Sequence, residues 1–402
     1  MQFEPAPRTK RRIAVLSTSR ADYSHLFWVL KELQQANDVD LRIIVSGAHL
    51  APTFGASVGL FGTHGFCIEA AVEALLDSDS DVGMAKTTGV AMLGLADVLG
   101  RLRPDLLLLI ADRYEMLAPA ATALALRIPI AHIEGGEVSE GAIDDAVRNA
   151  LTKLSHIHFV STATARRRVM AMGEASWRVH HAGAPSLDHL RRSNLPNRAD
   201  LEARLGVALT PAPCVVSFHP VTLHADTSAE AFELFAALAR IDLPIVFCFP
   251  NADAGHQAII EMARAHCRRD AAARLFINLD PLDYWALLKH AALIVGNSSS
   301  GIMESPSLAL PCVNVGMRQR GRERAANVVD CAADRDAIVA AIRTAVSDTF
   351  ARGIKDLANP YGDGDSARRI VRVLREVPLG ASLLVKTALP LTPSGPPAFL
   401  NE

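Results

Sequence analysis

Short apolar runs alternate along this chain with turns rich in glycine, serine, asparagine and aspartate, and a longer amphipathic segment follows each turn. This alternation is typical of a parallel sheet whose strands are connected by helices on both faces. In the first half the pattern predicts strands at residues 12–16, 41–45, 106–110, 128–132 and 156–160. A second set of strands is predicted at residues 214–218, 245–249, 275–278, 293–295 and 312–315.

Two successive sets of five strands predict an α/β fold in which two Rossmann-like domains face each other across a cleft. A polar connection separates the sets, so we expect a first domain at residues 1–190 and a second at 200–364. Residues 365–379 are expected to form a final helix that packs back on the first domain. The tail at 380–402 contains "LPLTPSGPP" and is predicted to be Pro-rich and loose.

The charge balance limits the classes of partner. The 402 residues include 41 basic and 43 acidic side chains, with a formal net charge of -2, so no positive excess favours nucleic acid or a membrane surface. The longest purely aliphatic run, residues 106–110, is far too short to span a bilayer. No apolar stretch of the signal-peptide kind follows "MQFEPAPRTKRR", so we expect a cytoplasmic protein.

Neither a metal nor a disulfide is indicated by the cysteines and histidines. The cysteines are scattered without a CxxC pair, so we expect buried free thiols; they are Cys67, Cys214, Cys248, Cys267, Cys312 and Cys331. Several histidines come into question as ligands, but they share no spacing such as HExxH; they are His25, His49, His132, His156, His158 and His224. We therefore expect no metal and no cofactor.

Polar side chains follow the predicted strands at the point where each strand ends. Asp112 and Arg113 come directly after one strand, and Glu134 follows the next. In the second set the corresponding residues are His219, Asn251 and the run Ser298, Ser299, Ser300, Gly301. Open parallel sheets bind ligands beyond the carboxyl ends of their strands. A solvated loop explains any one of these residues, but it explains the whole set poorly.

The stretch "HIEGGEVSEGAIDDAVRNALTKL", residues 132–154, places five carboxylates within a dozen positions. Helical spacing of the apolar residues predicts a helix from about Ala142, with Asp144 and Asp145 in its first turn and Asp144 able to pair with Arg148. Two interpretations stay open: residues that merely stabilise a helix start, or acids and bases of a site. Glu134 favours the second, because it follows a buried strand and precedes two glycines.

Two further turns are candidates for anion binding. "GNSSSG", residues 296–301, precedes the predicted helix "IMESPSLAL", and backbone amides at a helix start bind anions, although a plain helix cap explains it too. "STSRADY", residues 17–23, presents Arg20, and a lone arginine there is more often structural than phosphate-binding. His219 precedes Pro220, so we expect its side chain to face a cleft rather than a core.

These residues carry a resemblance to the UDP-N-acetylglucosamine 2-epimerase family, specifically its hydrolysing branch. That branch contains bacterial enzymes of sialic-acid-type sugar synthesis and the epimerase half of the animal bifunctional epimerase/kinase. The likeness runs from about Arg12 to about Leu379 through motifs in the same order. They are "SRADY", "ADRYEML", "IPIAHIEGGEVSEGAIDDAVRNALTKLSHIHFVST", "AGAPSLD", "FHPVT", "FPNADAG", "GNSSSGIMESPS", "NVGMRQRGRE" and "YGDG". The resemblance implies a GT-B type fold, the stand-alone bacterial form and a homodimer or homotetramer.

The resemblance also implies roles for individual residues. The positions that match the family's catalytic residues are Asp112, Glu134, Asp144 and His219. The positions that match its diphosphate-binding residues are Arg20, Arg113, Ser298, Ser299 and Arg318. Glu304 matches the carboxylate that binds the ribose hydroxyls, and Asn251 lies on the nucleotide wall. We hypothesise that Asp112 and Glu134 handle protons at C2 and C1, with support from Asp144, while His219 assists the leaving diphosphate.

The chain departs from the family pattern at several positions. Ala111 stands where a glycine is usual, and Thr18 stands where many members have glycine; a positive φ at either would cost about 1 kcal/mol or more. Asn149 replaces a histidine that is common after the helix arginine. Glu261 occupies the first of two arginine positions that help the animal enzyme bind its feedback inhibitor, CMP-sialic acid, so we expect no such feedback here.

The implied reaction converts UDP-N-acetylglucosamine and water into N-acetylmannosamine and UDP, in sialic-acid-type sugar biosynthesis. A base removes the weakly acidic proton at C2 while the C1–O bond to UDP breaks, and water adds to the resulting 2-acetamidoglucal. Clustered carboxylates suit this chemistry, because burial and repulsion push their pKa values apart. Three alternatives stay open: a related enzyme acting on UDP-2,4-diacetamido-2,4,6-trideoxyglucose in a legionaminic acid pathway, a GT-B glycosyltransferase, and a non-catalytic UDP-sugar sensor.

Overall fold

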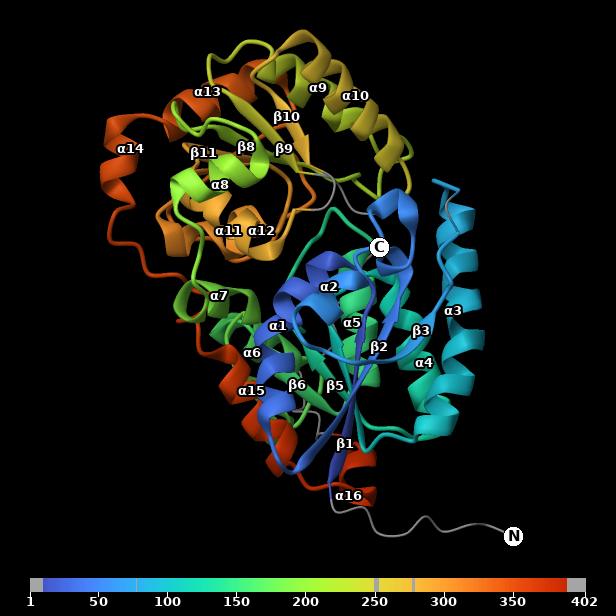
Figure 1. The fold of residues 1–402 in the computed structure, drawn as a ribbon. Helices are drawn as coiled ribbons and strands as arrows, with labels where there is room; N and C mark the ends of the chain where they lie inside the picture. Colours follow the sequence, from blue (N-terminus) through green and yellow to red (C-terminus); the bar gives the residue numbers. More distant parts are fainter. Residues whose placement is uncertain (1–9, 77, 249–252, 277–278, 389–402) are drawn as a thin grey trace, which may run out of the picture.

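The computed structural model describes residues 10–388 except 77, 249–252 and 277–278, and within these ranges the strands form two parallel sheets, one in each lobe of the molecule (Figure 1). The first sheet has the order β3-β2-β1-β4-β5-β6-β7. Its strands are β1 Arg11–Ser17, β2 Val39–Ser46, β3 Ile68–Val72, β4 Leu106–Ile110, β5 Ile130–Ile133, β6 Ile157–Val160 and β7 Val179–His181. The second sheet has the order β10-β9-β8-β11-β12-β13. Its strands are β8 Cys214–Ser217, β9 Ile245–Cys248, β10 Arg274–Phe276, β11 Leu293–Gly296, β12 Cys312–Val315 and β13 Val328–Cys331.

Helices connect the strands in both lobes (Figure 1). In the first lobe they are α1 Arg20–Gln35, α2 Gly59–Thr63, α3 Asp81–Leu102, α4 Leu117–Leu126, α5 Asp144–Leu154, α6 Ala163–Ala171 and α7 Asp188–Arg192. In the second lobe they are α8 Arg198–Leu205, α9 Ala229–Leu238, α10 His256–Arg269, α11 Pro281–His290, α12 Ser300–Met303, α13 Arg335–Ala345 and α14 Asp348–Gly353. Two further helices, α15 Ser366–Glu376 and α16 Ala381–Leu384, end the described chain. The predicted α/β class with two Rossmann-like domains is confirmed.

Each predicted strand has a counterpart in the structure, although the ends of those predicted at 245–249 and 275–278 lie outside the described residues. Three strands were missed: β3, β7 and β13. Each is an edge strand of three to five residues with partly exposed side chains, as in the "VVDC" of β13. The prediction relied on continuous apolar runs, and only strands with both faces covered carry such runs. The buried "LLLLI" of β4 is the clearest example.

The start of α1 is fixed by a reciprocal capping box. Ser19 Oγ accepts from the backbone N–H of Asp22 at 3.3 Å, and Asp22 Oδ2 accepts from the backbone N–H of Ser19 at 3.1 Å. Thr18 also donates its backbone N–H to Asp22 Oδ2, at 2.8 Å. These bonds satisfy amide donors that a helix start otherwise leaves unpaired. The first turns of α1 are therefore held firmly against the end of β1.

Helix α3 is, among the described residues, the one helix long and apolar enough to cross a membrane by length and composition alone. Little of this helix is buried, and Val82, Val90 and Leu93 are exposed. Helix α3 lies on the outer side of the first lobe (Figure 1). One such helix is weak evidence for a membrane span, because helices of soluble folds can have the same length and composition. The expected lack of membrane binding stays a prediction.

The chain returns to the first lobe at its carboxyl end. Helix α15 packs beside α1, and both its first amides, those of Ser366 and Ala367, donate to the buried carboxylate of Asp188 at 2.9 Å each. The next segment is ordered as well, because Arg178 donates to the backbone oxygens of Leu383 and Val385, at 2.8 Å each. The expectation of a loose tail is therefore wrong for residues 381–385, and residues 389–402 lie outside the described ranges. The domain boundaries drawn from the sequence stay a prediction.

Candidate functional site

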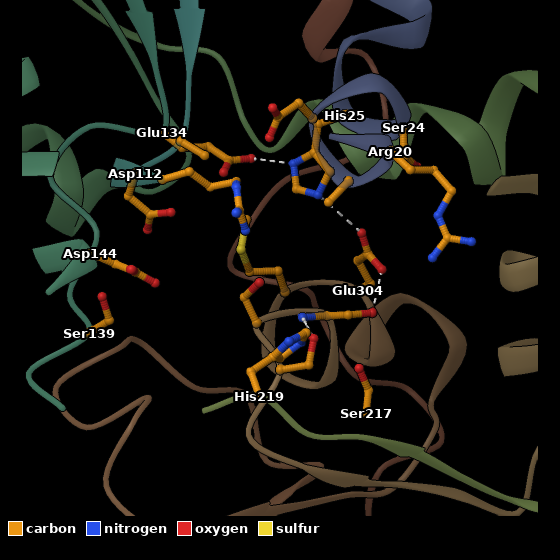
Figure 2. A pocket seen from close by; sticks show the side chains of 18 of the residues that line it. Arg20, Ser24, His25, Asp112, Glu134, Ser139, Asp144, Ser217, His219 and Glu304 are labelled. Carbon is orange, nitrogen blue, oxygen red and sulfur yellow. Dashed lines mark hydrogen bonds and ion pairs between the residues drawn. The ribbon is translucent and has the colours of Figure 1, made fainter. Parts of the chain in front are cut away.

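A pocket lies between the two lobes, at the carboxyl ends of both sheets (Figure 2). It brings together every predicted site residue that the structure describes: Arg20, Asp112, Arg113, Glu134, Asp144, His219, Ser298, Ser299, Glu304 and Arg318. The predicted nucleotide-wall residue Asn251 lies outside the described residues. Side chains separated by up to about three hundred positions in the sequence thus share one cavity, as the rule for parallel sheets predicts.

Two carboxylates reach the pocket because the backbone turns sharply after β4 and β5. Ala111 and Glu134, the first residues beyond these strands, have φ of +60° and +68°. The turn at Ala111 is held by its carbonyl, which accepts from His132 Nε2 at 2.7 Å. A left-handed conformation costs a non-glycine residue roughly 1–2 kcal/mol. The expected strain is therefore present at Ala111, whereas Thr18 has no positive φ.

Buried Arg148, on α5, organises the carboxylate side of the pocket. Its guanidinium donates to Asp112, to Ser139 Oγ at 2.9 Å and to Asp145 Oδ1 at 3.2 Å. It also donates to the backbone oxygen of Glu137 at 2.9 Å. A guanidinium offers five donors in a rigid fork, so four acceptors on one arginine fix the position of Asp112 closely.

The predicted pair of Asp144 with Arg148 is wrong. Asp144 turns instead to the second lobe, where Arg318 Nη2 donates to its Oδ2 at 2.9 Å. Arg148 is occupied by the acceptors beside β4, and residues four apart on a helix pair only when nothing stronger competes for them. Asp144 is therefore part of a contact across the cleft, and the interpretation of this residue as a mere helix-start charge does not describe its environment.

The two aspartates differ in their protonation. Burial disfavours the charged form of Asp112, but the positive charges of Arg148 and Arg322 outweigh it, and the pKa of Asp112 is lowered. Burial and then the neighbouring charge of Asp112 raise the pKa of Asp144 to about 7, even though Arg318 opposes this shift. At neutral pH one carboxylate is ionised and the other holds its proton for part of the time. This separation is what acid–base chemistry with two carboxylates requires.

His25, on α1, lies between two glutamates from opposite lobes, as Figure 2 shows. Its Nδ1 is 2.8 Å from Glu134 Oε1, and its Nε2 is 3.6 Å from Glu304 Oε1. Burial lowers the pKa of His25, but the carboxylates of Glu134, Glu304 and Asp22 raise it to about 9. The sequence analysis weighed His25 only as a metal ligand, and its role as a cation between carboxylates was missed.

The turn after β11 requires a glycine. Gly296 has φ of +143°, and a Cβ at this position would lie 2.0 Å from the backbone oxygen of Ser217 at the end of β8. This close approach lets Asn297 bond the backbone of His219 twice: Oδ1 accepts from its N–H at 2.8 Å, and Nδ2 donates to its oxygen at 2.9 Å. Asn297 was missed by the sequence analysis, although it lies inside the quoted "GNSSSG" motif.

The helix predicted over "IMESPSLAL" after "GNSSSG" is present only in part. Helix α12 has four residues, and a 3₁₀ turn, Ser305–Leu308, follows it, because Pro306 lacks the N–H that an α-helix would use. Ser299 stands at the N-cap position without a side-chain capping bond within the described structure. Ser300 Oγ donates instead to Glu304 Oε2 at 2.6 Å. A helix as short as α12 contributes little dipole, so the hydroxyls and amides of this turn are the groups available to an anion.

Three arginines and a histidine provide polar contacts on the remaining wall. Arg20 donates across the cleft to the backbone oxygen of Leu279 at 2.5 Å, and Arg113 donates to the buried Glu115 at 2.8 Å. Burial, with the charges of Arg318 and Arg113, keeps the pKa of His219 well below its ordinary value. The imidazole of His219 is therefore neutral at neutral pH and can donate one hydrogen bond without carrying a charge.

Among the described residues, no group of three or more His, Cys, Asp or Glu side chains is placed to hold a metal ion. The six cysteines are free thiols, as expected, but only Cys214 and Cys312 are buried. The prediction of burial is wrong for Cys67, which is exposed because it precedes the edge strand β3, and it holds only in part for the other three.

Comparisons with known proteins found similar sequences over most of the chain. A family model described as UDP-N-acetylglucosamine 2-epimerase matches residues 31–375. The UDP-N,N'-diacetylbacillosamine 2-epimerase (hydrolyzing) of Legionella pneumophila is 36% identical over 378 residues, which cover 94% of this chain and 98% of that protein. The GDP/UDP-N,N'-diacetylbacillosamine 2-epimerase (hydrolyzing) of Campylobacter jejuni is 35% identical over 327 residues, covering 80% of this chain and 84% of that protein.

A solved structure shows the same fold. The UDP-GlcNAc 2-epimerase from Neisseria meningitidis bound to UDP-GlcNAc superposes with a TM-score of 0.75 at 17% sequence identity, over 90% of this chain and 99% of that one. At this identity the likeness concerns the fold alone. The GT-B type arrangement expected from the sequence is confirmed.

Proposed function

Because this chain belongs to the UDP-N-acetylglucosamine 2-epimerase family, with hydrolysing enzymes among its relatives, we propose that it removes UDP from a UDP-2-acetamido sugar, inverts C2 and releases the free sugar. The observation that supports this most is the pair of aspartates with opposite pKa shifts beside cationic side chains from both lobes. Proton transfer at C2 and departure of UDP, which gains a further negative charge as the C1–O bond breaks, need these two kinds of group together.

The first step is an elimination. A carboxylate takes the proton from C2 while the electron pair of the C–H bond forms the C1–C2 double bond, and the C1–O bond to UDP breaks. Asp112 is the ionised group with the best-fixed position, and Glu134 is the second candidate. The diphosphate would be received by the groups that the resemblance assigns to it: Arg20, Arg113, Ser298, Ser299 and Arg318, with His219 beside them and Glu304 at the ribose.

The second step adds water across the double bond. The oxygen of water bonds to C1, one of its protons goes to a carboxylate, and C2 receives a proton on the face opposite to the one it lost. Asp144 is suited to the donor role, because its pKa of about 7 leaves it partly protonated at neutral pH. This sharpens the hypothesis from the sequence, in which Asp144 only supports Asp112 and Glu134.

For the sugar itself we propose UDP-2,4-diacetamido-2,4,6-trideoxyglucose, that is, UDP-N,N'-diacetylbacillosamine, with UDP-N-acetylglucosamine as the second candidate. The two relatives at 35% and 36% identity carry the first sugar in their names. UDP-N-acetylglucosamine was favoured by the sequence analysis and is the sugar in the family description. The two products, 2,4-diacetamido-2,4,6-trideoxymannose and N-acetylmannosamine, belong to legionaminic-acid-type and sialic-acid-type biosynthesis.

The test is proton NMR of the purified protein with each UDP-sugar in D2O. We expect release of UDP and of a free sugar of manno configuration that carries deuterium at C2, with a higher kcat/KM for the diacetamido substrate. UDP release without deuterium at C2 would contradict elimination. Release only in the presence of an added acceptor would favour a GT-B glycosyltransferase, and binding without turnover would favour a UDP-sugar sensor.

We also retain the homodimer or homotetramer that the resemblance implies, as a proposal. Its support is the apolar outer side of α3, where Leu93 is 75% exposed and Val82 is 57% exposed. Sedimentation velocity of the wild type and of Leu93→Glu measures the assembly. A wild type that sediments as a monomer at micromolar concentration would contradict the proposal. A cytoplasmic location stays a prediction.

A further inference from the structure

The imidazole of His25 is placed where two carboxylates from opposite lobes converge. Glu134 belongs to the first lobe, directly beyond β5, and Glu304 to the second, directly beyond α12. The exposed fractions of the two glutamate side chains are 8% and 6%, and that of His25 is 18%. Two buried anions this close repel each other strongly unless a cation lies between them. Figure 2 shows the ring of His25 in that position, with a contact on each side.

We infer that His25 is a positioning residue: as an imidazolium it bridges Glu134 and Glu304 across the cleft, and so holds the Glu134 carboxylate in a fixed orientation beside the pocket. The inference rests on the proposed function, because it assigns a task to a side chain through one of the proposed acid–base groups. Its geometric support is the 2.8 Å contact to Glu134 and the 3.6 Å contact to Glu304.

The surroundings on both sides keep this arrangement rigid. On the second lobe, Glu304 Oε2 accepts from Ser300 Oγ at 2.6 Å, and Ser300 Oγ is 2.8 Å from the hydroxyl of Tyr284. The Glu304 oxygen that faces His25 is the other one, Oε1. Each carboxylate oxygen of Glu304 thus has its own partner, and the bridge does not compete with the hydrogen bonds of the second lobe.

The charge on His25 depends on the groups that face it. These are Glu134 beyond β5, Glu304 beyond α12, Asp22 on its own helix and His189 on α7. The three carboxylates favour the imidazolium and raise the pKa of His25 to about 9. Burial keeps the pKa of His189 down at about 4, so this neighbour is neutral when His25 is charged. The bridge is therefore complete at neutral pH and opens as the pH rises through about 9.

The first experiment needs no substrate. The imidazole signals of histidine-labelled protein are followed by NMR from pH 5 to 10.5, with His25→Gln used to assign the signal. We expect His25 to titrate well above its ordinary range in the wild type, and at clearly lower pH in Glu134→Gln and in Glu304→Gln. A His25 signal that titrates at or below the ordinary histidine pKa, or that is unchanged by Glu134→Gln, would overturn the inference.

The second experiment compares kcat of the wild type with that of His25→Gln as a function of pH. Glutamine keeps a hydrogen-bond donor but has no charge, so we expect a loss in kcat of ~10- to 100-fold near pH 7, with KM within a few-fold. The ratio of the two kcat values should shrink above pH 9, where the wild type loses the charge as well. A ratio that is the same at all pH values would indicate a merely structural role and would overturn the inference.

Two controls separate the outcomes. His181→Gln changes an exposed histidine of the same lobe and should keep wild-type kcat and the wild-type pH profile. Lysine at position 25, in His25→Lys, restores a charge and should recover part of the loss. If the wild type turns over no UDP-sugar, the proposed function fails, while the NMR titration still decides whether the bridge exists. If turnover is observed but the titration shows no coupling to Glu134, only the bridge fails.

Discussion

The two edges of the cleft carry different kinds of polar group. The first lobe contributes carboxylates on short, sharply turned segments, with two consecutive strands ending in left-handed residues, Ala111 and Glu134. The second lobe contributes hydroxyls and backbone amides on a glycine turn and a four-residue helix, and the neutral imidazole of His219 after β8. Its charged groups in the pocket, Arg318 and Glu304, both face partners in the first lobe. Buried ionisable groups with shifted pKa values suit proton transfer, whereas uncharged donors suit the binding of an anion that must also leave. The difference therefore suggests that the carboxylates of the first lobe perform the proton transfer, and that the second lobe holds the nucleotide together with Arg20 and Arg113 of the first.

The two lobes contact each other through charged side chains at two points in the pocket. Arg318 of the second lobe donates to Asp144 of the first, and His25 of the first lobe lies beside Glu304 of the second. The protonation of the first lobe's acids thus depends on how close the second lobe lies. The protonation of these carboxyl groups should therefore differ between a partly open and a closed molecule. We expect lobe closure and the protonation of the acid–base groups to change together.

The largest expected effect tests the proposed role of the first-lobe carboxylates in proton transfer. Asp112→Asn removes the ionised carboxylate that Arg148 positions, so kcat should fall by ~10²- to 10⁴-fold, which is the usual contribution of a positioned acid or base. Affinity for UDP should stay within a few-fold of wild type, since the proposed nucleotide contacts lie elsewhere. Turnover is measured by UDP release, and UDP affinity by calorimetry.

Asn149→Ala is a matched control for this change. Asn149 lies one residue from Arg148 on α5 and bonds Asp145 rather than Asp112, so kcat should change by no more than a few-fold. If Asp112→Asn weakened UDP binding as much as it lowered kcat, the separation of chemistry from binding would not hold.

The pH dependence of kcat is the next largest effect. The raised pKa of Asp144 means that its carboxyl group is neutral below about pH 7 and ionised above it, so a proton donor is lost as the pH rises. We expect kcat to fall about tenfold per pH unit well above pH 7. Asp144→Asn, which can never donate an acidic proton, should show a low kcat without this fall. A wild-type profile that is flat from pH 6 to 9 would remove Asp144 from the donor role.

The proposed role of the second lobe in binding the diphosphate is tested by the double variant Ser298→Ala with Ser299→Ala. Two hydroxyl hydrogen bonds to the diphosphate contribute about 0.5–1.5 kcal/mol each, so the Kd for UDP should rise by about 5- to 150-fold while kcat stays within a few-fold. Calorimetry with UDP and steady-state kinetics measure the two quantities. Equal losses in kcat would show that these hydroxyls act in the transition state rather than in binding.

The smallest expected effect concerns the strained backbone of Ala111, beyond β4 in the first lobe. Ala111→Gly relieves the left-handed conformation at φ of +60°, but glycine also loosens the unfolded chain, so the two effects largely offset each other. The free energy of unfolding should rise by at most about 1 kcal/mol, as measured by urea denaturation. A marked loss of stability would mean that the Ala111 methyl group is needed for packing beside the pocket.

The sequence allowed the carboxylates after β4 and β5 to be placed because β4 is a continuous apolar run and β5 is apolar except for His132. The residues that follow such strands lie at the ligand-binding edge of the sheet. Short edge strands such as β7, with two histidines in three residues, lack that signal. The same limit applies to the turn after β11. "IMESPSLAL" has helical composition, but Pro306 and the contacts of Ser300 end the α-helix early.

Pairings across the cleft could not be predicted from spacing. Periodicity on α5 indicates which residues share a helix face, and it suggested Arg148 as the partner of Asp144. The actual partner, Arg318, is 174 positions away. His25 presents the same difficulty, since a histidine in the second turn of an amphipathic helix gives no sign that two distant glutamates will meet around it. Charged contacts between lobes depend on tertiary geometry, which local patterns do not encode.

Two separate stretches of chain join the lobes, one between α7 and α8 and the other between α14 and α15. Their first-lobe ends are bonded to each other, because Asp188 of α7 accepts from the amides of Ser366 and Ala367 of α15, and the amide of Ala184 donates to the oxygen of Tyr361 at 2.7 Å. A single connection would let one lobe rotate about several axes relative to the other. Two connections that lie side by side favour rotation about a single hinge axis, so each closure is expected to bring the same residues of the two lobes together.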